Sequence, residues 1–329
     1  MWEINNKTPF ASEGSFKYDH TGKNTWIVII KAGFDILPGN EIKTAEDQPE
    51  ILRSPEYNFE PGISSIKHDI DFIIDKPATD VILNGSAIAP SNKPVKKLEV
   101  GLKLGQHINK KLIVTGDRVW RNDILGTKSL TIPFAKMPIV YERAFGGTDI
   151  THKKQSKHGC IKENPVGTGF ARKSANLKGQ KVPNIENKKC VIKNQAAGFG
   201  AIAAHWEPRA SFAGKFNKKN SNSEPISFNK DFDLRYNQQA PLDQQVKGYL
   251  TGKEQITLKN LHKDSSLSFK LPDIKPICLI RFDMSYIEKK PNLHTVIIEP
   301  DDNKLVMVWH TAIECHRKEH LLQETIIRL

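Results

Sequence analysis

The sequence predicts a mainly β protein, built from sandwich-like antiparallel sheets with long loops and few short helices. Short apolar runs rich in β-branched residues recur along the chain, the first at residues 26–30 (Trp-Ile-Val-Ile-Ile). The 21 glycines and 19 prolines fall largely between such runs, where they favour turns. We find no heptad pattern and no fixed-period repeat, which argues against a coiled coil or a solenoid.

The first 150 residues contain most of the expected strands. Residues 26–30, 71–74 and 80–83 are apolar runs of strand length, and Lys76-Pro77 between the last two suits a connection. Apolar residues alternate over 95–105, which predicts a half-buried strand, and another follows at 112–120 after a hairpin connection at 107–110. A further apolar stretch at 130–140 is interrupted by Pro133 and Pro138.

Strand signals return after residue 196. Residues 260–272 alternate, and apolar runs occupy 277–282, 293–298 and 305–309. The Pro-Asp-Asp-Asn sequence at 300–303 predicts a turn, so the last two runs should form a hairpin. We expect a short helix over residues 314–323.

Composition indicates a globular chain with a sizeable core, since 38% of the 329 residues are hydrophobic and 26% are charged. We expect one domain over residues 1–329. Two β lobes, at about 1–150 and 196–329, joined by a basic loop-rich segment at 151–195, are an alternative arrangement within it. No apolar run approaches the ~20 residues of a membrane helix. The first residues lack a charged region followed by an apolar one, so we expect a cytoplasmic protein.

Cysteine usage fits a reducing compartment. The four cysteines, Cys160, Cys190, Cys278 and Cys315, are far apart and form no C-x-x-C pair. Buried or isolated thiols are therefore favoured over a disulfide framework.

Positive charge is concentrated in one part of the chain. The net charge is +12, and residues 151–220 carry 15 lysines and arginines against three acidic residues, so the whole excess lies there. Such a field attracts an acidic partner or nucleic acid. A solvated lysine-rich loop is the alternative. The candidate partner-binding residues are Lys153, Lys154, Lys157, Arg172, Lys173, Lys188 and Lys189.

No residue pattern indicates catalysis. His316 and His320 would share one helical face, but the sequence there is His-Arg-Lys-Glu-His, which lacks the H-E-x-x-H order of a zinc site and places cations beside it. Acidic residues between Asp231 and Glu254 adjoin turn formers, where turn hydrogen bonds or salt bridges explain them. There is no nucleophile elbow, P-loop or dinucleotide-binding fingerprint. We expect no catalytic residue, no metal and no cofactor.

Aromatic residues are interleaved with basic ones between residues 206 and 236. This pattern is compatible with stacking on single-stranded nucleic acid, which makes a nucleic-acid-binding protein using residues 151–220 the alternative function. Packing in the β core is the commoner role of aromatic side chains.

A set of short motifs runs in order along nearly the whole chain. They are residues 6–10 (NKTPF), 26–30, 141–147 (YERAFGG), 163–170 (ENPVGTGF), 198–200 (GFG), 206–209 (WEPR), 213–214 (AG), 232–233 (FD), 240–245 (APLDQQ), the Gly252-x-Glu254 step and 271–272 (LP). With them, the chain resembles the adaptor, or chaperone-like, proteins of bacterial type VI secretion systems. It departs from that pattern at residues 217–223, which are polar where the family usually has a tryptophan, and in having no pentapeptide repeats.

The resemblance implies a non-catalytic adaptor that binds a toxic effector and helps to load it onto a spike. The implied partners are the effector toxin, a PAAR-repeat tip protein and a VgrG spike protein, with neither nucleic acid nor membrane. It also marks family-motif residues as determinants of the fold or of an interface. These are Trp206, Pro208, Arg209, Asp233, Pro241, Asp243, Gln244, Gly252 and Glu254.

Overall fold

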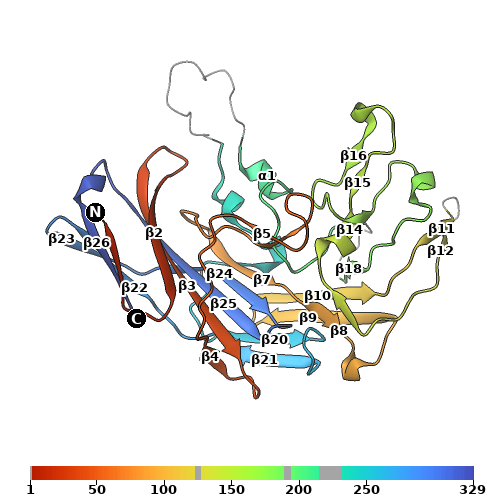
Figure 1. The fold of residues 1–329 in the computed structure, drawn as a ribbon, viewed down its shortest axis with the longest axis horizontal. Coiled ribbons are helices and arrows are strands. Elements are labelled where there is room, and N and C mark those ends of the chain that lie inside the picture. The colour runs from red at the N-terminus through yellow and green to blue at the C-terminus, as the bar shows by residue number, and fades with distance from the viewer. Residues whose placement is uncertain (1, 123–126, 189–193, 215–230) are drawn as a thin grey trace.

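The computed structural model describes residues 2–122, 127–188, 194–214 and 231–329. It confirms the predicted fold class, because the chain forms several antiparallel and mixed sheets (Figure 1). In these residues the α-helical structure is α1 (Arg209–Phe212), and the remaining helical segments are short 3-10 turns. No described helix is long and apolar enough to span a membrane.

The central element is a seven-stranded sheet with the order β19-β7-β24-β25-β3-β2, in which β4 also pairs with β3. Its strands are β2 (Ala11–Tyr18), β3 (Asn24–Ile36), β4 (Ile42–Thr44), β7 (Ala78–Leu83), β19 (Gln245–Lys247), β24 (Asn292–Glu299) and β25 (Lys304–Glu314). Neighbours are antiparallel except β7 and β24, which run parallel. The predicted hairpin around residues 300–303 is confirmed as β24–β25.

Strand β3 shows why the central sheet forms. Its side chains alternate between two apolar cores: Trp26, Val28 and Ile30 enter one, and Ile27 and Ile29 enter the other. A strand that is apolar on both faces must be covered on both sides, and this explains the continuous apolar run at residues 26–30.

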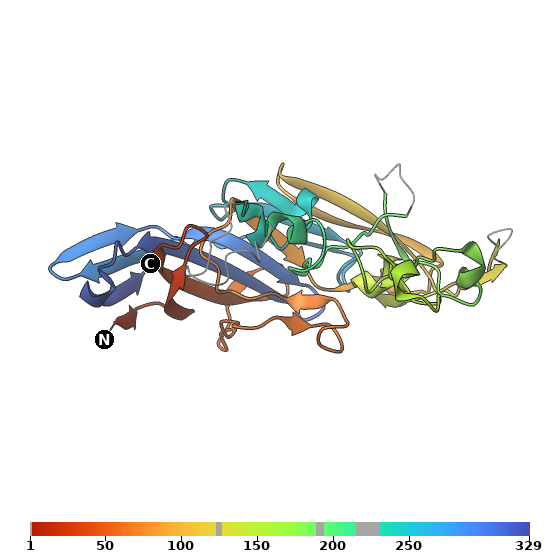
Figure 2. The same cartoon turned by 90° about the horizontal axis from the view of Figure 1, so that it is seen from above.

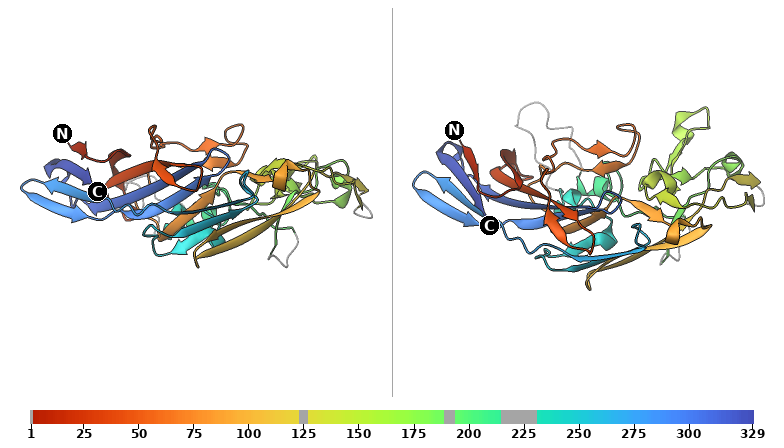
Figure 3. Two further views of the ribbon diagram at one scale, coloured as in Figure 1. Left: turned by 90° about the horizontal axis from the view of Figure 1, so that it is seen from below. Right: turned by 60° about the horizontal axis from the view of Figure 1, so that its bottom comes forward.

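A five-stranded sheet shares the first of these cores. Its order is β18-β10-β9-β20-β21, with β9 (Lys97–Leu104), β10 (Ile108–Thr115), β18 (Ile185–Asn187), β20 (Gln255–Lys259) and β21 (Ser266–Lys270). Leu102, Leu104 and Leu258 lie in the same buried cluster as Val28 and Met307 of the central sheet. The two sheets therefore pack face to face, as a sandwich does (Figure 3).

A four-stranded sheet, β1-β26-β22-β23, extends one end of the molecule. It consists of β1 (Glu3–Asn6), β22 (Ile277–Phe282), β23 (Ser285–Lys289) and β26 (Leu322–Arg328), and β1 runs parallel to β26. Figure 2 shows that the molecule is elongated, with this sheet at one end and the described residues within 118–182 at the other.

Short strand pairs build the second end and the covering loops. They are β5 (Glu56–Tyr57) with β6 (Ile66–His68), β8 (Ser86–Ile88) with β13 (Lys136–Pro138), β11 (Trp120–Asn122) with β12 (Thr127–Lys128), β14 (Phe145–Gly146) with β17 (Thr168–Gly169), and β15 (Thr148–Asp149) with β16 (Gly159–Cys160). The 3-10 turns are η1 (Pro90–Asn92), η2 (Tyr141–Arg143), η3 (Gln155–Lys157), η4 (Ser174–Leu177), η6 (Leu234–Asn237), η7 (Leu242–Gln244) and η8 (Glu319–Leu321).

Each large sheet contains strands from both parts of the sequence. The central sheet joins β3 and β7 to β24 and β25, and the five-stranded sheet joins β9 and β10 to β20 and β21. The four-stranded sheet joins β1 to β26. The ranges 1–150 and 196–329 are thus interleaved in space.

Three expected elements are wrong. Residues 71–74 are irregular, because the Asp71 carboxylate accepts from Leu52 N–H and Lys31 and fixes the segment across the sheet face. The hairpin connection lies at residues 105–107, where Gly105 has φ +45°, and residues 108–110 already belong to β10.

The third correction concerns residues 314–323, which form no α-helix. Strand β25 continues to Glu314 opposite Thr25, and His316 and Arg317 then adopt positive φ values of 49° and 63°, which a helix does not allow. The chain returns through η8 into β26, which pairs with β22. His316 and His320 therefore share no helical face.

Candidate partner-binding surface

The basic candidates lie on a separate end of the molecule, which we call the basic end. It comprises the described residues within 118–132 and 148–182 and forms the yellow-green end in Figure 1. Backbone hydrogen bonds join its two parts: Trp120 N–H donates to Gln180 O, and Val182 N–H donates to Arg118 O.

A glycine-asparagine junction attaches this end to the rest of the fold. Asn164 is fully buried, and its side-chain amide donates to the carbonyl oxygens of Tyr141 and Phe145 over 2.8 and 3.1 Å. Gly147 has φ +111°, and a Cβ there would lie 2.7 Å from the Gly167 oxygen. The two sequence motifs at 141–147 and 163–170 therefore meet at this junction, which explains their glycines.

Asp149 organises the loops that carry the lysines. Its carboxylate accepts from the Thr151 hydroxyl at 2.6 Å, from Thr151 N–H at 3.0 Å and from Arg172 N–H at 2.8 Å, and it also accepts from the Asn176 amide. These hydrogen bonds, led by those from Thr151, hold the pKa of Asp149 well below its usual range. One buried carboxylate thus holds residue 151 beside residues 172 and 176.

Five of the predicted partner-binding residues are exposed together around this anchor. Lys153, Lys154 and Lys157 occupy the loop between β15 and β16, and Arg172 and Lys173 precede η4. Arg172 lies against Gly159, since a Cβ on that glycine would be 2.7 Å from its Nε. Among the described residues, no carboxylate lies within ion-pair distance of these five cations.

The last two candidates are placed differently. Lys188 forms an ion pair with Glu99 at the edge of the five-stranded sheet, a carboxylate that it shares with Lys111 and Lys259. Lys189 lies outside the described residues.

Exposed aliphatic side chains accompany the cations. Leu130 is 84% exposed and Ile150 is 67% exposed, and Val119 and Ile132 are also exposed. Lys128 lies over the Trp120 ring with 4.8 Å between its Nζ and the ring centroid, on the same end. Exposed aliphatic residues supply apolar area that the docking of another protein can bury.

The family-motif residues lie elsewhere. Some adjoin a group of buried polar side chains beneath the central sheet, which we call the polar layer, and the others form turns and ion pairs. Trp206 is 1% exposed and packs edge-on against Tyr141, with 5.6 Å between ring centroids. Arg209, at the start of α1, is 5% exposed and donates to the Asp69 carboxylate at 2.7 Å. Pro208 precedes this residue and occupies the N-cap position of α1 without a side-chain hydrogen bond to the helix.

Asp80 is the centre of the polar layer. It is fully buried, pairs with the equally buried Lys76 at 2.6 Å, and accepts from the Gln238 amide and the Gln239 and Ala240 N–H groups. The motif at 240–245 continues this arrangement. Gln244 is fully buried and donates to the carbonyl oxygens of β7 residue Val81 and of Phe199.

The remaining motif residues form turns and ion pairs. Asp243 accepts from Lys110 at 2.7 Å, Pro241 precedes η7, and Asp233 caps η6 by accepting from Arg235 N–H. Gly252 has φ +93°, and the Glu254 carboxylate accepts from Thr251 N–H at 2.9 Å. In this structure the motif residues mostly hold the fold.

Buried histidines and lysines are the polar residues that the sequence analysis missed. The rings of His294 and His310 stack with 4.7 Å between centroids, and both side chains are buried. Burial lowers the pKa of His294, and it lowers the pKa of His310 well below the usual value. Lys31 pairs with Asp71 at 2.8 Å in the same layer. The sequence signal was a polar residue within or next to an apolar run: His294 lies within 293–298, and Lys31 and His310 directly follow 26–30 and 305–309.

A histidine with two glutamate partners is a candidate for catalytic or metal-binding chemistry. His68 contacts Glu56 at 2.6 Å and Glu299 at 3.1 Å beside a cavity of about 260 Å³. Burial opposes its charge, but these two hydrogen bonds raise the pKa of His68, and His68 in turn helps to lower the pKa of Glu299 to about 2. This arrangement favours an ion pair over a free base. No group of three or more His, Cys, Asp or Glu side chains in the described ranges is arranged to bind a metal.

The fold and this surface together define a β-rich protein with a polar layer under its central sheet and a separate basic end. Residues 21–310 match DUF2169, a family described as an uncharacterized protein conserved in bacteria, and the chain belongs to it. No curated protein and no solved structure matches the chain.

Proposed function

We propose that the protein is a non-catalytic adaptor that captures an acidic protein surface with its basic end. The observation that carries the proposal is the group of five uncompensated cations, residues 153, 154, 157, 172 and 173, held on loops that a buried carboxylate anchors. The partners that we propose come from the resemblance to type VI secretion adaptors: a toxic effector, a PAAR-repeat tip protein and a VgrG spike protein.

Electrostatic attraction is the physical basis of the adaptor proposal. Over residues 148–182 the basic end carries eight lysines and arginines against two acidic residues, so its local charge is positive. Complementary charge raises the association rate and makes binding sensitive to salt, while exposed aliphatic residues such as Leu130 and Ile150 supply area that is buried on docking. Both features support capture of a folded partner.

A nucleic-acid-binding protein is the second candidate, since the same charge attracts phosphates. Stacking on bases requires exposed aromatic rings. In the described part of the basic end the strongly exposed apolar residues are aliphatic. Of the aromatic residues between 206 and 236 that are described, Trp206 is buried and Phe212, Phe232 and Tyr236 are half-buried. The lack of strongly exposed aromatic rings among these described residues supports a protein partner over nucleic acid.

The first experiment is an affinity capture of the tagged protein from its native cells at low and high salt, with mass spectrometry of what is bound. We expect a secretion tip or spike protein together with a toxin. Recovery of nucleic acid without any secretion component would favour the second candidate.

The second experiment measures association rates of the captured partner with a charge-reversed variant. Lys153→Glu, Lys154→Glu and Lys157→Glu together should slow association, most strongly at low salt. The matched control reverses Lys43, Lys93 and Lys263, which are exposed lysines outside the basic end, and gives the same change of net charge. Equal rates for the two triple variants would show that net charge acts without a local surface.

A further inference from the structure

The opposite end of the molecule carries a sheet edge that no other described strand pairs with. Strand β23 is the last strand of the four-stranded sheet and pairs on one side with β22. Residues 285–288 are exposed on both faces of the strand. Met284 is 83%, Tyr286 53% and Ile287 37% exposed. Unpaired backbone groups beside exposed apolar residues form a template for one more strand.

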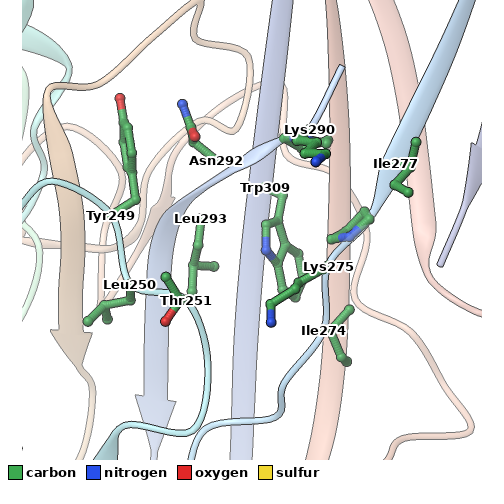
Figure 4. A pocket seen from close by; sticks show the side chains of 12 residues that line it. Tyr249, Leu250, Thr251, Ile274, Lys275, Ile277, Lys290, Asn292, Leu293 and Trp309 are labelled. Carbon is green, nitrogen blue, oxygen red and sulfur yellow. The ribbon is translucent and has the colours of Figure 1, made fainter. Parts of the chain in front are cut away.

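A pocket lies where β23 ends. Its cavity of about 360 Å³ opens at the seam between the four-stranded and central sheets (Figure 4). The lining is mostly apolar, with Leu250, Ile274, Ile277 and Leu293 around the buried Trp309, and with Lys275 and Lys290 beside them. This volume accommodates one large side chain.

Charge at the end of the strand selects the occupant. Lys289 and Lys290 follow one another, and within the described chain neither has a carboxylate at ion-pair distance, although Glu288 precedes them. Lys275 is compensated by Asp273 at 3.1 Å. An added strand would therefore meet apolar residues over 284–287 and two free cations at 289–290. A second copy of the chain is disfavoured, because each copy carries a net charge of +12.

We propose that β23 binds an extended segment of a partner protein by strand addition, with an acidic pair of that segment facing Lys289 and Lys290. Apolar residues before the acidic pair pack on Tyr286 and Ile287, and an apolar residue beyond it enters the pocket beside Trp309. This site goes beyond the proposed function and lies at the other end of the molecule from the basic end (Figure 1). The protein then holds two partners, or two parts of one partner, at its two ends.

The test uses a fluorescein-labelled peptide of about ten residues, the length of a long strand. Two adjacent aspartates are flanked on both sides by valine and isoleucine, and a matched peptide has lysines in place of the aspartates. Fluorescence anisotropy against the full chain gives the affinities. We expect binding of the acidic peptide and at least about tenfold weaker binding of the lysine peptide, a difference of about 1.4 kcal/mol.

Variants locate the site. Ile287→Lys places a charge on the free edge, and Lys290→Glu reverses the charge at the pocket, so each should weaken binding of the acidic peptide. Both residues are exposed, so the fold tolerates the changes, and thermal unfolding checks this. Lys263→Glu, an exposed lysine on the turn between β20 and β21, is the control with equal charge change and should bind as the parent does.

Three outcomes overturn the proposal. The first is that the acidic peptide does not bind the parent protein. The second is that both edge variants bind the acidic peptide as tightly as the parent protein does. The third is a dimer in sedimentation that Ile287→Lys abolishes, which would assign the edge to a second copy. The charge reversal at residues 153, 154 and 157 should leave peptide binding unchanged, so a failure of the adaptor proposal is distinguishable from a failure of this one.

Discussion

Removing the Asp80 carboxylate tests whether the polar layer holds the fold. In Asp80→Ala the Lys76 ammonium stays buried without a counter-charge, and the Gln238 amide and two backbone N–H groups lose their acceptor. Breaking a buried pair by removing one partner costs about 3–5 kcal/mol. For a chain of 329 residues, an unfolding entropy of about 2.1 cal/mol/K per residue converts this into a fall in Tm of roughly 4–7 °C.

The assay is urea unfolding followed by tryptophan fluorescence and circular dichroism, with thermal scans in parallel. Asp273→Ala is the matched control, because it removes a carboxylate that pairs with two exposed lysines, Lys253 at 2.7 Å and Lys275 at 3.1 Å. Exposed pairs are worth about 0–1 kcal/mol each, so the control should cost much less. If the two variants lose equal stability, the buried pair has no special role and the reasoning fails.

Three further predictions follow from single residues. Burial holds the His310 pKa well below its ordinary value, so the unfolded chain binds more protons, and the contribution of His310 to stability should fall as the pH drops from about 7 to 5. In His310→Phe the urea-derived stability should therefore fall less over that range than in the parent. Gly252→Ala should cost about 1–3 kcal/mol in urea unfolding, since φ is +93° and its Cβ would lie 2.6 Å from a backbone oxygen. Gly248→Ala, with φ +73° and nothing within 4 Å, should cost less, and equal losses would show that the close contact is irrelevant. Burial raises the pKa of Cys278 to about 12, so peptide mapping after mild iodoacetamide treatment should find Cys160 alkylated and Cys278 intact; the reverse order would contradict the burial.

The strands were predictable where burial on both faces leaves an unbroken apolar run. Residues 26–30, 80–83 and 305–309 follow that rule, and the Pro-Asp-Asp-Asn sequence at 300–303 consists of residues that favour a turn. Residues 71–74 have the same composition, yet Asp71 fixes them by contacts with Leu52 and Lys31 that are distant in sequence. Local pattern carries no information on such contacts.

The candidate surfaces were also only partly predictable from the sequence. A run of uncompensated charge is visible in composition, so five of the seven basic candidates could be found from the sequence, whereas the pairing of Lys188 with Glu99 depends on the sheet register. The free edge of β23 was not predictable, because its exposure depends on which strand lies last in the sheet. Lys31 and His310 directly follow apolar runs and Asp80 begins one, and such positions are the sign that buried polar residues leave in a sequence.

The interleaved sheets have a consequence for synthesis. Strand β3 pairs with β25, so Trp26 has no partner strand on that side until Ile313 has been synthesised. At about 5–20 residues per second, a ribosome needs roughly 15–60 s to make the intervening chain. During that time β3 exposes two apolar faces and an unpaired edge, which other chains can bind. Such long-range pairing also slows folding itself. Nascent chains of this protein therefore need protection from aggregation until the last strands leave the ribosome.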